Sequence, residues 1–149
     1  MPPVNPVVAI VNQKGGVGKS TTAINLAAYL AEKGQRILVV DMDPQGNATS
    51  GLGVTPDPGG CMYDVLLEGK PVQDVAVGTR VEGLEVAPAT INLVGAEVEL
   101  VSSLAREFKL KRALEKLPLD SRRLLSLRSR PSPEPSTACS ALPMSSYSR

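Results

Sequence analysis

The residue types with the clearest chemical use form a short run near the start of the chain, from Lys14 to Thr21. Its glycines leave room for backbone N–H groups to turn toward phosphate oxygens. Lys19 can reach the β- and γ-phosphates of a nucleoside triphosphate, and the Ser20 hydroxyl can bind Mg²⁺. The run therefore predicts nucleotide binding by Lys14, Gly15, Gly16, Val17, Gly18, Lys19, Ser20 and Thr21. The alternative is a chance cluster of glycine and lysine on a surface turn.

Two elements must hold this run in place. Residues Val7–Val11 are apolar and mostly β-branched, which predicts a fully buried parallel strand. After the run, apolar residues recur at helical spacing as far as Lys33, and Gly34 then ends the helix. The beginning of that helix adds a dipole that favours anions. A buried strand, a glycine loop and a helix in this order make the chance alternative the less favoured one.

The loop departs from the common phosphate-binding pattern G-x-x-x-x-G-K-[ST]. That pattern would place a glycine at position 13, where this chain has Gln13. A second lysine, Lys14, stands at the front edge of the loop, where it cannot repeat the work of Lys19. We expect Lys14 to point outward, across an interface, toward the nucleotide of another subunit.

Two carboxylates come after a second apolar run, Ile37–Val40, at Asp41 and Asp43. The carboxyl ends of parallel strands face the ligand, so we expect this pair beside the glycine loop. One carboxylate can orient the hydration shell of a metal or the Ser20 hydroxyl, and the other can position the attacking water. We assign the water to Asp43 and predict Ser20 and Asp43 as the metal site. The alternative is that the pair only ends the strand and caps the next segment of the chain.

The remaining pattern predicts an α/β fold with a parallel sheet flanked by helices, built on a right-handed βαβ unit. An amphipathic helix at residues 104–117 carries five cations, and a solvated helix face is favoured over a DNA-binding stripe. The other expected elements are a long loop at 44–60, a short helix at 62–68, a strand at 84–87 and a helix at 92–102.

Composition excludes several classes of protein. The chain has 149 residues, of which 42% are hydrophobic and only 3% aromatic, so base stacking on aromatic platforms is disfavoured. Cys61 and Cys139, without any histidine, do not form the pattern of a zinc site or a disulfide scaffold. We find neither a signal peptide nor a membrane-spanning run, so we expect a cytoplasmic protein with no membrane partner.

The character of the chain changes after Asp120. Residues 121–149 are rich in Arg, Ser and Pro, contain no Lys and have Glu134 as their one acidic residue. We therefore divide the chain into residues 1–120 and a disordered tail at 121–149. Shifted GC-rich codons tend to encode this composition, and we interpret the tail as an out-of-frame translation. A natural disordered basic tail is the alternative.

Two stretches carry a resemblance to a known family. VNQKGGVGKSTTAINLAAYLA and ILVVDMDPQGNATSGLG resemble the deviant Walker A ATPases of the ParA/Soj family, which partition chromosomes and plasmids. The segments PATINLVGAEVELV and REFKLKRALEKL resemble the next parts of the same family. The resemblance covers about residues 5–120.

The resemblance implies an ATP-dependent, nucleoid-associated homodimer that binds DNA non-specifically and hydrolyses ATP under stimulation by a ParB-type partner. Lys14 would be the catalytic signature lysine that reaches the partner subunit's nucleotide, and Lys19 the P-loop lysine. Ser20 would bind Mg²⁺, Thr21 would contact the α-phosphate, and Asp43 would be the switch carboxylate needed for hydrolysis.

The chain also departs from the family. After Leu117, where the family continues with a strand that carries the Walker B aspartate, we find no such strand. The later half, including most of the DNA-binding surface, is missing as well. We expect an exposed sheet edge and weak or absent ATP hydrolysis. Two alternatives stay open: an inactive fragment that at most binds nucleotide, and a MinD-like membrane-associated regulator, which the sequence Asp43–Asn47 disfavours.

Overall fold

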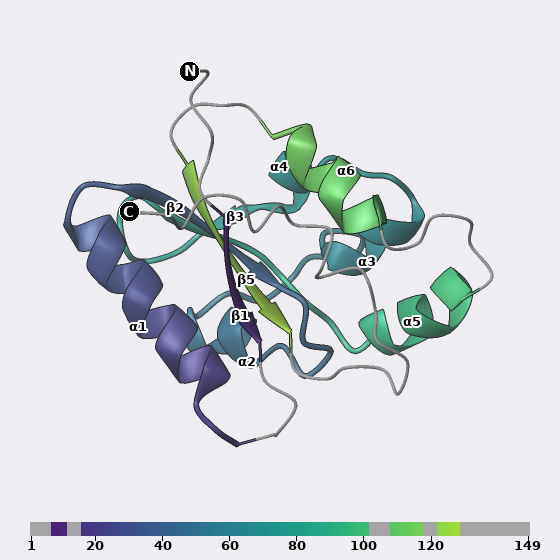
Figure 1. The fold of residues 1–149 in the computed structure, drawn as a ribbon, viewed down its shortest axis with the longest axis horizontal. Helices are drawn as coiled ribbons and strands as arrows, with labels where there is room; N and C mark the ends of the chain where they lie inside the picture. The colour runs from purple at the N-terminus through teal and green to yellow at the C-terminus, as the bar shows by residue number, and fades with distance from the viewer. Residues whose placement is uncertain (1–6, 12–15, 102–107, 118–121, 129–149) are drawn as a thin grey trace, which may run out of the picture.

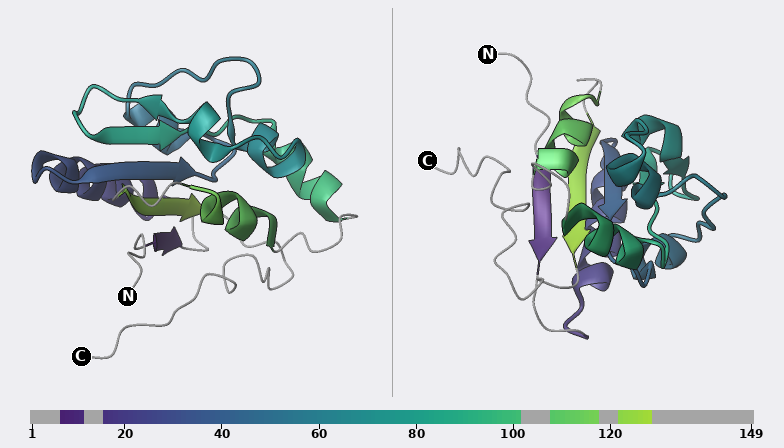
Figure 2. Two further views of the ribbon diagram at one scale, coloured as in Figure 1. Left: turned by 90° about the horizontal axis from the view of Figure 1, so that it is seen from above. Right: turned by 90° about the vertical axis from the view of Figure 1, so that its right-hand side faces the viewer.

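The computed structural model describes residues 7–11, 16–101, 108–117 and 122–128, which form one sheet with helices on both faces (Figures 1 and 2). The strands are β1 (Val7–Val11), β2 (Arg36–Asp41), β3 (Val77–Gly78), β4 (Leu84–Ala87) and β5 (Arg122–Arg128). The helices are α1 (Lys19–Glu32), α2 (Asn47–Gly51), α3 (Met62–Leu67), α4 (Val72–Val75), α5 (Leu93–Val101) and α6 (Lys109–Glu115). The predicted α/β class is confirmed.

The strand order is β1-β5-β2-β4-β3. The pairs β1–β5, β5–β2 and β2–β4 are parallel, whereas the two-residue β3 pairs antiparallel with β4. The sheet is therefore mixed rather than purely parallel. The antiparallel edge results from the short connection between β3 and β4, because five residues are enough for a reversal but not for a crossover.

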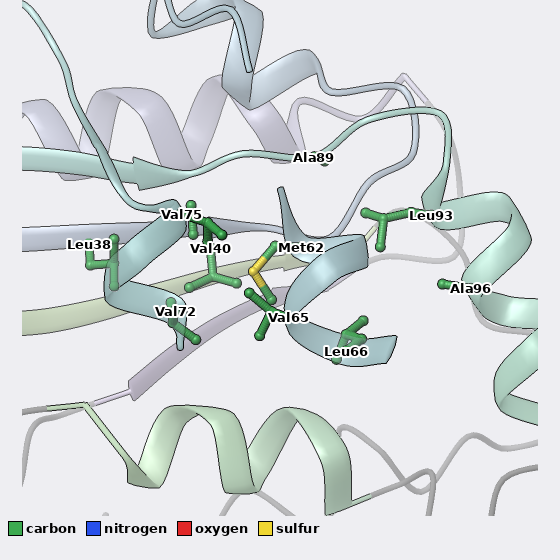
Figure 3. Packing of buried hydrophobic residues seen from close by; sticks show 11 residues of the cluster. Leu38, Val40, Met62, Val65, Leu66, Val72, Val75, Ala89, Leu93 and Ala96 are labelled. Carbon is green, nitrogen blue, oxygen red and sulfur yellow. The ribbon is translucent and has the colours of Figure 1, made fainter. Parts of the chain in front are cut away.

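Two hydrophobic clusters cover the two faces of β2. Leu38 and Val40 belong to a cluster with α3, α4 and α5, while Ile37 and Val39 belong to a cluster with α1 and α2. This alternation is what a strand buried on both faces requires. Figure 3 shows Met62 at the centre of the first cluster, next to Val65.

Helix α1 lies close to the sheet because its buried stripe consists of alanines. Ala23, Ala27 and Ala31 are four residues apart and buried, whereas the larger Leu26 is 36% exposed. The helix ends as predicted at Gly34, whose φ of +80° lies in the left-handed region that glycine adopts readily. The Gly34 N–H donates to the Ala31 carbonyl at 2.8 Å, and the Gln35 N–H donates to the Leu30 carbonyl at 3.2 Å.

The prediction that Val7–Val11 is fully buried is wrong. Val7 and Val8 are 40% and 42% exposed. The physical reason is the position of β1, which is an edge strand of the described sheet and has a pairing partner only on the side of β5. Its apolar composition is typical of a central strand, and composition alone does not reveal the strand order.

The prediction of a disordered tail from residue 121 onward is wrong for residues 122–128, which form a strand. Strand β5 lies between β1 and β2, with Val8 opposite Leu125 and Leu38 opposite Leu124. The Arg and Ser content of this run obscured a seven-residue segment with three leucines. Residues 122–128 contain no carboxylate, so β5 does not supply an aspartate from within the strand. Residues 129–149 lie outside the described residues, and the out-of-frame origin of the tail stays a hypothesis.

The other expected elements are present with shifted bounds. The short helix, the third strand and the later helix appear as α3, β4 and α5. The long loop predicted at 44–60 is interrupted by α2. Of the helix predicted at 104–117, residues 109–115 form α6, and residues 102–107 lie outside the described residues.

Candidate functional site

The loop that precedes α1 turns through two glycines in the left-handed region. Gly16 has a φ of +71° and Gly18 a φ of +86°. A Cβ atom at either position would meet nothing within 4 Å, so the need for glycine is conformational rather than one of space. In the described part of the loop, the space next to Gly16 and Gly18 is therefore open. Lys14 and Gly15 lie outside the described residues.

Helix α1 begins directly at the end of this loop. The Thr22 N–H donates to the Gly18 carbonyl at 2.8 Å and closes the first turn. Lys19 and Ser20 are partly buried, and Val17 and Thr21 are exposed. No acidic side chain stands in the first turn, so the positive end of a 14-residue helix is not neutralised from within. This geometry suits an anion.

Asp41, at the end of β2, is completely buried and fully engaged within the protein. One of its oxygens accepts hydrogen bonds from the Thr49 N–H at 2.9 Å and the Thr49 hydroxyl at 2.7 Å. The other accepts from the Asp43 N–H at 3.0 Å. For Asp41 the structure therefore supports the alternative of a residue that ends the strand and caps the next segment of the chain.

Burial has an electrostatic cost at this carboxylate. Desolvation raises the pKa of Asp41 above its usual value, and the hydrogen bonds from Thr49 and Asp43 only partly offset that effect. The neighbouring charge of Asp43 raises the pKa further.

Thr49 links three segments of the chain, and sequence reasoning did not identify it. Its hydroxyl donates to Asp41 and accepts from the Ala89 N–H at 3.0 Å. The end of β2, helix α2 and the segment after β4 therefore meet at one buried hydroxyl. A threonine eight residues after an aspartate does not form a recognised motif, so the sequence contained no signal for the role of Thr49.

Asp43 lies at the start of the turn that leads into α2. It is 7% exposed, and one carboxylate oxygen accepts from the Gln45 N–H at 2.9 Å. Its carbonyl accepts from the Gly46 N–H at 2.8 Å, and Gly46 has a φ of +61°. These bonds hold the carboxylate at the end of the turn beside β2. Among the described residues, none donates a hydrogen bond to its second oxygen atom, which is open to a ligand.

Helix α2 packs directly against α1. A Cβ atom added at Gly51 would lie 2.5 Å from Cδ1 of Ile24, so the backbone of α2 reaches the side chains of α1. Figure 1 shows α2 close to the beginning of α1, at the end of the sheet where β1 ends. The turn that carries Asp43 and the start of α1 that carries Ser20 are thus at one end of the sheet.

The donor types at this end of the sheet fit a magnesium nucleotide. The Ser20 hydroxyl and the Asp43 carboxylate are oxygen ligands of the kind that Mg²⁺ prefers, and the open loop can take phosphates. Within the described ranges, no group of three or more His, Cys, Asp or Glu is placed to hold a metal ion. None of the described helices is long and apolar enough to span a membrane.

Comparisons with known proteins show which family this chain resembles. The family described as "AAA domain" matches residues 5–120. The chain is 58% identical over 110 residues to the sporulation initiation inhibitor protein Soj of Bacillus subtilis. The aligned residues make up 73% of this chain and 44% of that protein. It is 55% identical over 115 residues to the chromosome partitioning protein ParA of Myxococcus xanthus, and the aligned residues make up 76% of this chain and 41% of that protein. The chain thus spans less than half the length of these relatives.

A solved structure shares the fold. Cobyrinic acid a,c-diamide synthase of Mycobacterium smegmatis, with bound ATP analogue and magnesium, superposes with a TM-score of 0.78 at 43% identity. The match covers 87% of this chain and 52% of that one.

The contacts of Thr49 predict a strong difference between two substitutions. Thr49→Val removes the hydroxyl and leaves an Asp41 oxygen and the Ala89 N–H with one partner fewer, so we expect a loss of about 2–4 kcal/mol in the free energy of unfolding. Thr49→Ser keeps the hydroxyl, and we expect a loss of about 1 kcal/mol. Urea unfolding at pH 7 measures both values, and equal losses would contradict the assigned role of the hydroxyl.

The raised pKa of Asp41 predicts a pH dependence of known sign. Because the folded pKa lies above the unfolded value of 3.8, the folded state binds more protons between these two pKa values. The contribution of Asp41 to stability is therefore greatest below pH 3.8 and falls as pH rises through the folded pKa. We expect the stability difference between wild type and Asp41→Asn, measured by urea unfolding, to decrease across this window and then level off. A difference that grows with pH would refute the sign.

Proposed function

We propose, from the membership of this chain in the ParA/Soj family of P-loop ATPases, that it binds ATP and Mg²⁺ and acts in chromosome or plasmid partitioning. The observation that carries the proposal is the loop with left-handed glycines at positions 16 and 18, followed at once by Lys19 and Ser20 at the start of α1. Backbone N–H groups, a lysine and a helix terminus, which are the groups that a phosphate requires, then follow one another within a few residues of the chain.

Each residue of the loop has a separate role in this proposal. Lys19 contacts the β- and γ-phosphates, Thr21 the α-phosphate, and Ser20 binds the magnesium ion together with Asp43 through their oxygens. Mg²⁺ bound there neutralises charge on the phosphates. Asp43 also orients the attacking water with the oxygen that does not accept from Gln45.

Lys14 supports the dimeric part of the proposal. It stands at the front of the loop, and by family resemblance it reaches the nucleotide of a second copy of the chain. Dimerisation would depend on ATP, because the γ-phosphate is the group that the neighbouring lysine contacts. A ParB-type partner and non-specific DNA belong to the same proposal, with most of the DNA-binding surface outside this chain.

A second candidate function is that of a fragment that binds nucleotide without appreciable hydrolysis. Two observations favour it. Strand β5, beside the P-loop strand β1, contains no carboxylate to assist the metal. Strand β1 also has no described partner on its outer side, which leaves the strand before the loop with less support.

Nucleotide binding can be tested by substitutions at the two lysines. Lys19→Ala should weaken Mg-ADP binding by about 10- to 100-fold, because a charge-assisted contact to phosphate is lost. Lys14→Ala should leave Mg-ADP binding within about threefold but prevent ATP-dependent dimerisation. Calorimetry and sedimentation measure the two effects. The proposal is refuted if folded wild-type protein takes up neither Mg-ATP nor Mg-ADP.

A substitution at Asp43 can distinguish ATP binding from ATP hydrolysis. Asp43→Asn should retain Mg-ATP binding and lower any measurable ATP turnover by about 100-fold, because the group that positions the water is lost. Asp57→Asn, at an exposed carboxylate outside the site, is the control and should leave turnover unchanged. Turnover that survives in Asp43→Asn would assign the water to another residue. Wild-type turnover equal to that of an intact relative would exclude the fragment alternative.

A further inference from the structure

A second concave site lies between α6 and the turn that connects α3 to α4. The cleft has a volume of about 220 Å³. Four cations line it, Lys70 from the turn and Lys109, Arg112 and Lys116 from α6, and Glu68 is the one carboxylate among its described lining residues. We call this site the basic cleft.

The packing of α6 gathers three of these cations. Residues 109, 112 and 116 have the spacing i, i+3, i+7, which places them on one face of the helix. Leu110, Leu114 and Leu117 pack instead against the hydrophobic cluster of α3 and α4. The same contacts that bury the leucines therefore turn the cations toward the α3–α4 turn.

Within the part of the chain that the structure describes, the cations of the cleft have few carboxylates close to them. On α6, Glu115 is engaged with Lys111 at 3.8 Å, and Lys111 does not line the cleft. No described carboxylate lies within 4 Å of the charged groups of Lys109, Arg112 or Lys116. The Lys70 ammonium donates to the Gly59 carbonyl, a bond that orients the lysine and leaves its charge in place.

We propose that the basic cleft binds a phosphate group. Four positive charges around a small concavity suit a compact anion, and the guanidinium of Arg112 has the fork geometry that matches phosphate oxygens. The volume is below that of sites that enclose a whole drug-sized ligand, so the cleft takes the phosphate and not a complete nucleotide. Sequence analysis favoured a solvated face for these cations; their position in a cleft favours an anion site instead.

The basic cleft is separate from the glycine loop. Helix α6 packs with the cluster on one face of β2, whereas α1 packs with the cluster on the other face. Figure 2 shows α6 and α1 on opposite sides of the sheet. The phosphate in the cleft therefore belongs to a second ligand, which is either free polyphosphate or the backbone of a nucleic acid.

The test uses the full chain with Lys19→Ala, so that the glycine loop competes less strongly for phosphate. The probes are tripolyphosphate, measured by calorimetry, and a labelled DNA duplex of about 20 base pairs, measured by fluorescence anisotropy at about 50–200 mM salt. Arg112→Glu with Lys116→Glu should weaken binding of the probe by about tenfold or more. If the probe is DNA, the slope of log affinity against log salt should also fall by about two.

The matched control is Lys33→Glu with Arg80→Glu, which changes the net charge equally at two exposed positions that do not line the cleft. It should change affinity by no more than about twofold. Arg112→Gln with Lys116→Gln serves as the second variant if the reversed one does not fold, as judged by circular dichroism.

The outcomes distinguish the sources of phosphate. Cleft-dependent binding of tripolyphosphate alone assigns a free phosphate ligand, and cleft-dependent binding of the duplex assigns a nucleic-acid backbone. The proposal is overturned if the protein that carries only Lys19→Ala binds neither probe at about 1 mM. It is also overturned if the control substitutions at Lys33 and Arg80 weaken binding as much as the cleft substitutions at Arg112 and Lys116. Mg-ADP uptake by the wild type is measured separately, so neither result bears on the nucleotide site.

Discussion

The buried carboxylate of Asp41 is the constraint on which the arrangement around the candidate site depends. A carboxylate in the interior is tolerated only when its oxygens are hydrogen-bonded, and here Thr49 and the Asp43 N–H provide those bonds. Because Thr49 also accepts from the Ala89 N–H, one buried network joins β2, α2 and the segment after β4. The turn that carries Asp43 is therefore held at both of its ends.

The sheet order determines how the rest of the chain supports this network. β2 is a central strand with a parallel neighbour on each side, and its two faces carry the two hydrophobic clusters. β1, which leads into the glycine loop, lies at the described edge and is exposed. The proposed metal-binding half of the candidate site thus follows the buried strand β2, and the proposed phosphate-binding half follows the exposed strand β1.

Charge is distributed unevenly over the two faces of the sheet. On one face, α1 and α2 bring together the glycine loop and the Asp43 turn. There, in the proposed function, the charge of a magnesium ion would offset the charge of the nucleotide phosphates. On the other face, α6 brings together cations, and Glu68 is the one carboxylate among the described residues that line their cleft. The two proposed anion sites lie on opposite faces and share no residue, so binding at one would not block the other.

The sequence by itself determined the local elements whose signals lie within a few residues: the glycine loop, the helix that ends at Gly34, the short strand at 84–87 and the ParA/Soj family. These result from backbone preferences and from periodicity. Only the tertiary structure decided that β5 separates β1 from β2, that Asp41 is structural, and that Thr49 joins three segments. It also decided that the α6 cations line a cleft. Each of these depends on contacts between residues distant in the chain, and local pattern contains no information on which distant partner will fill a given space.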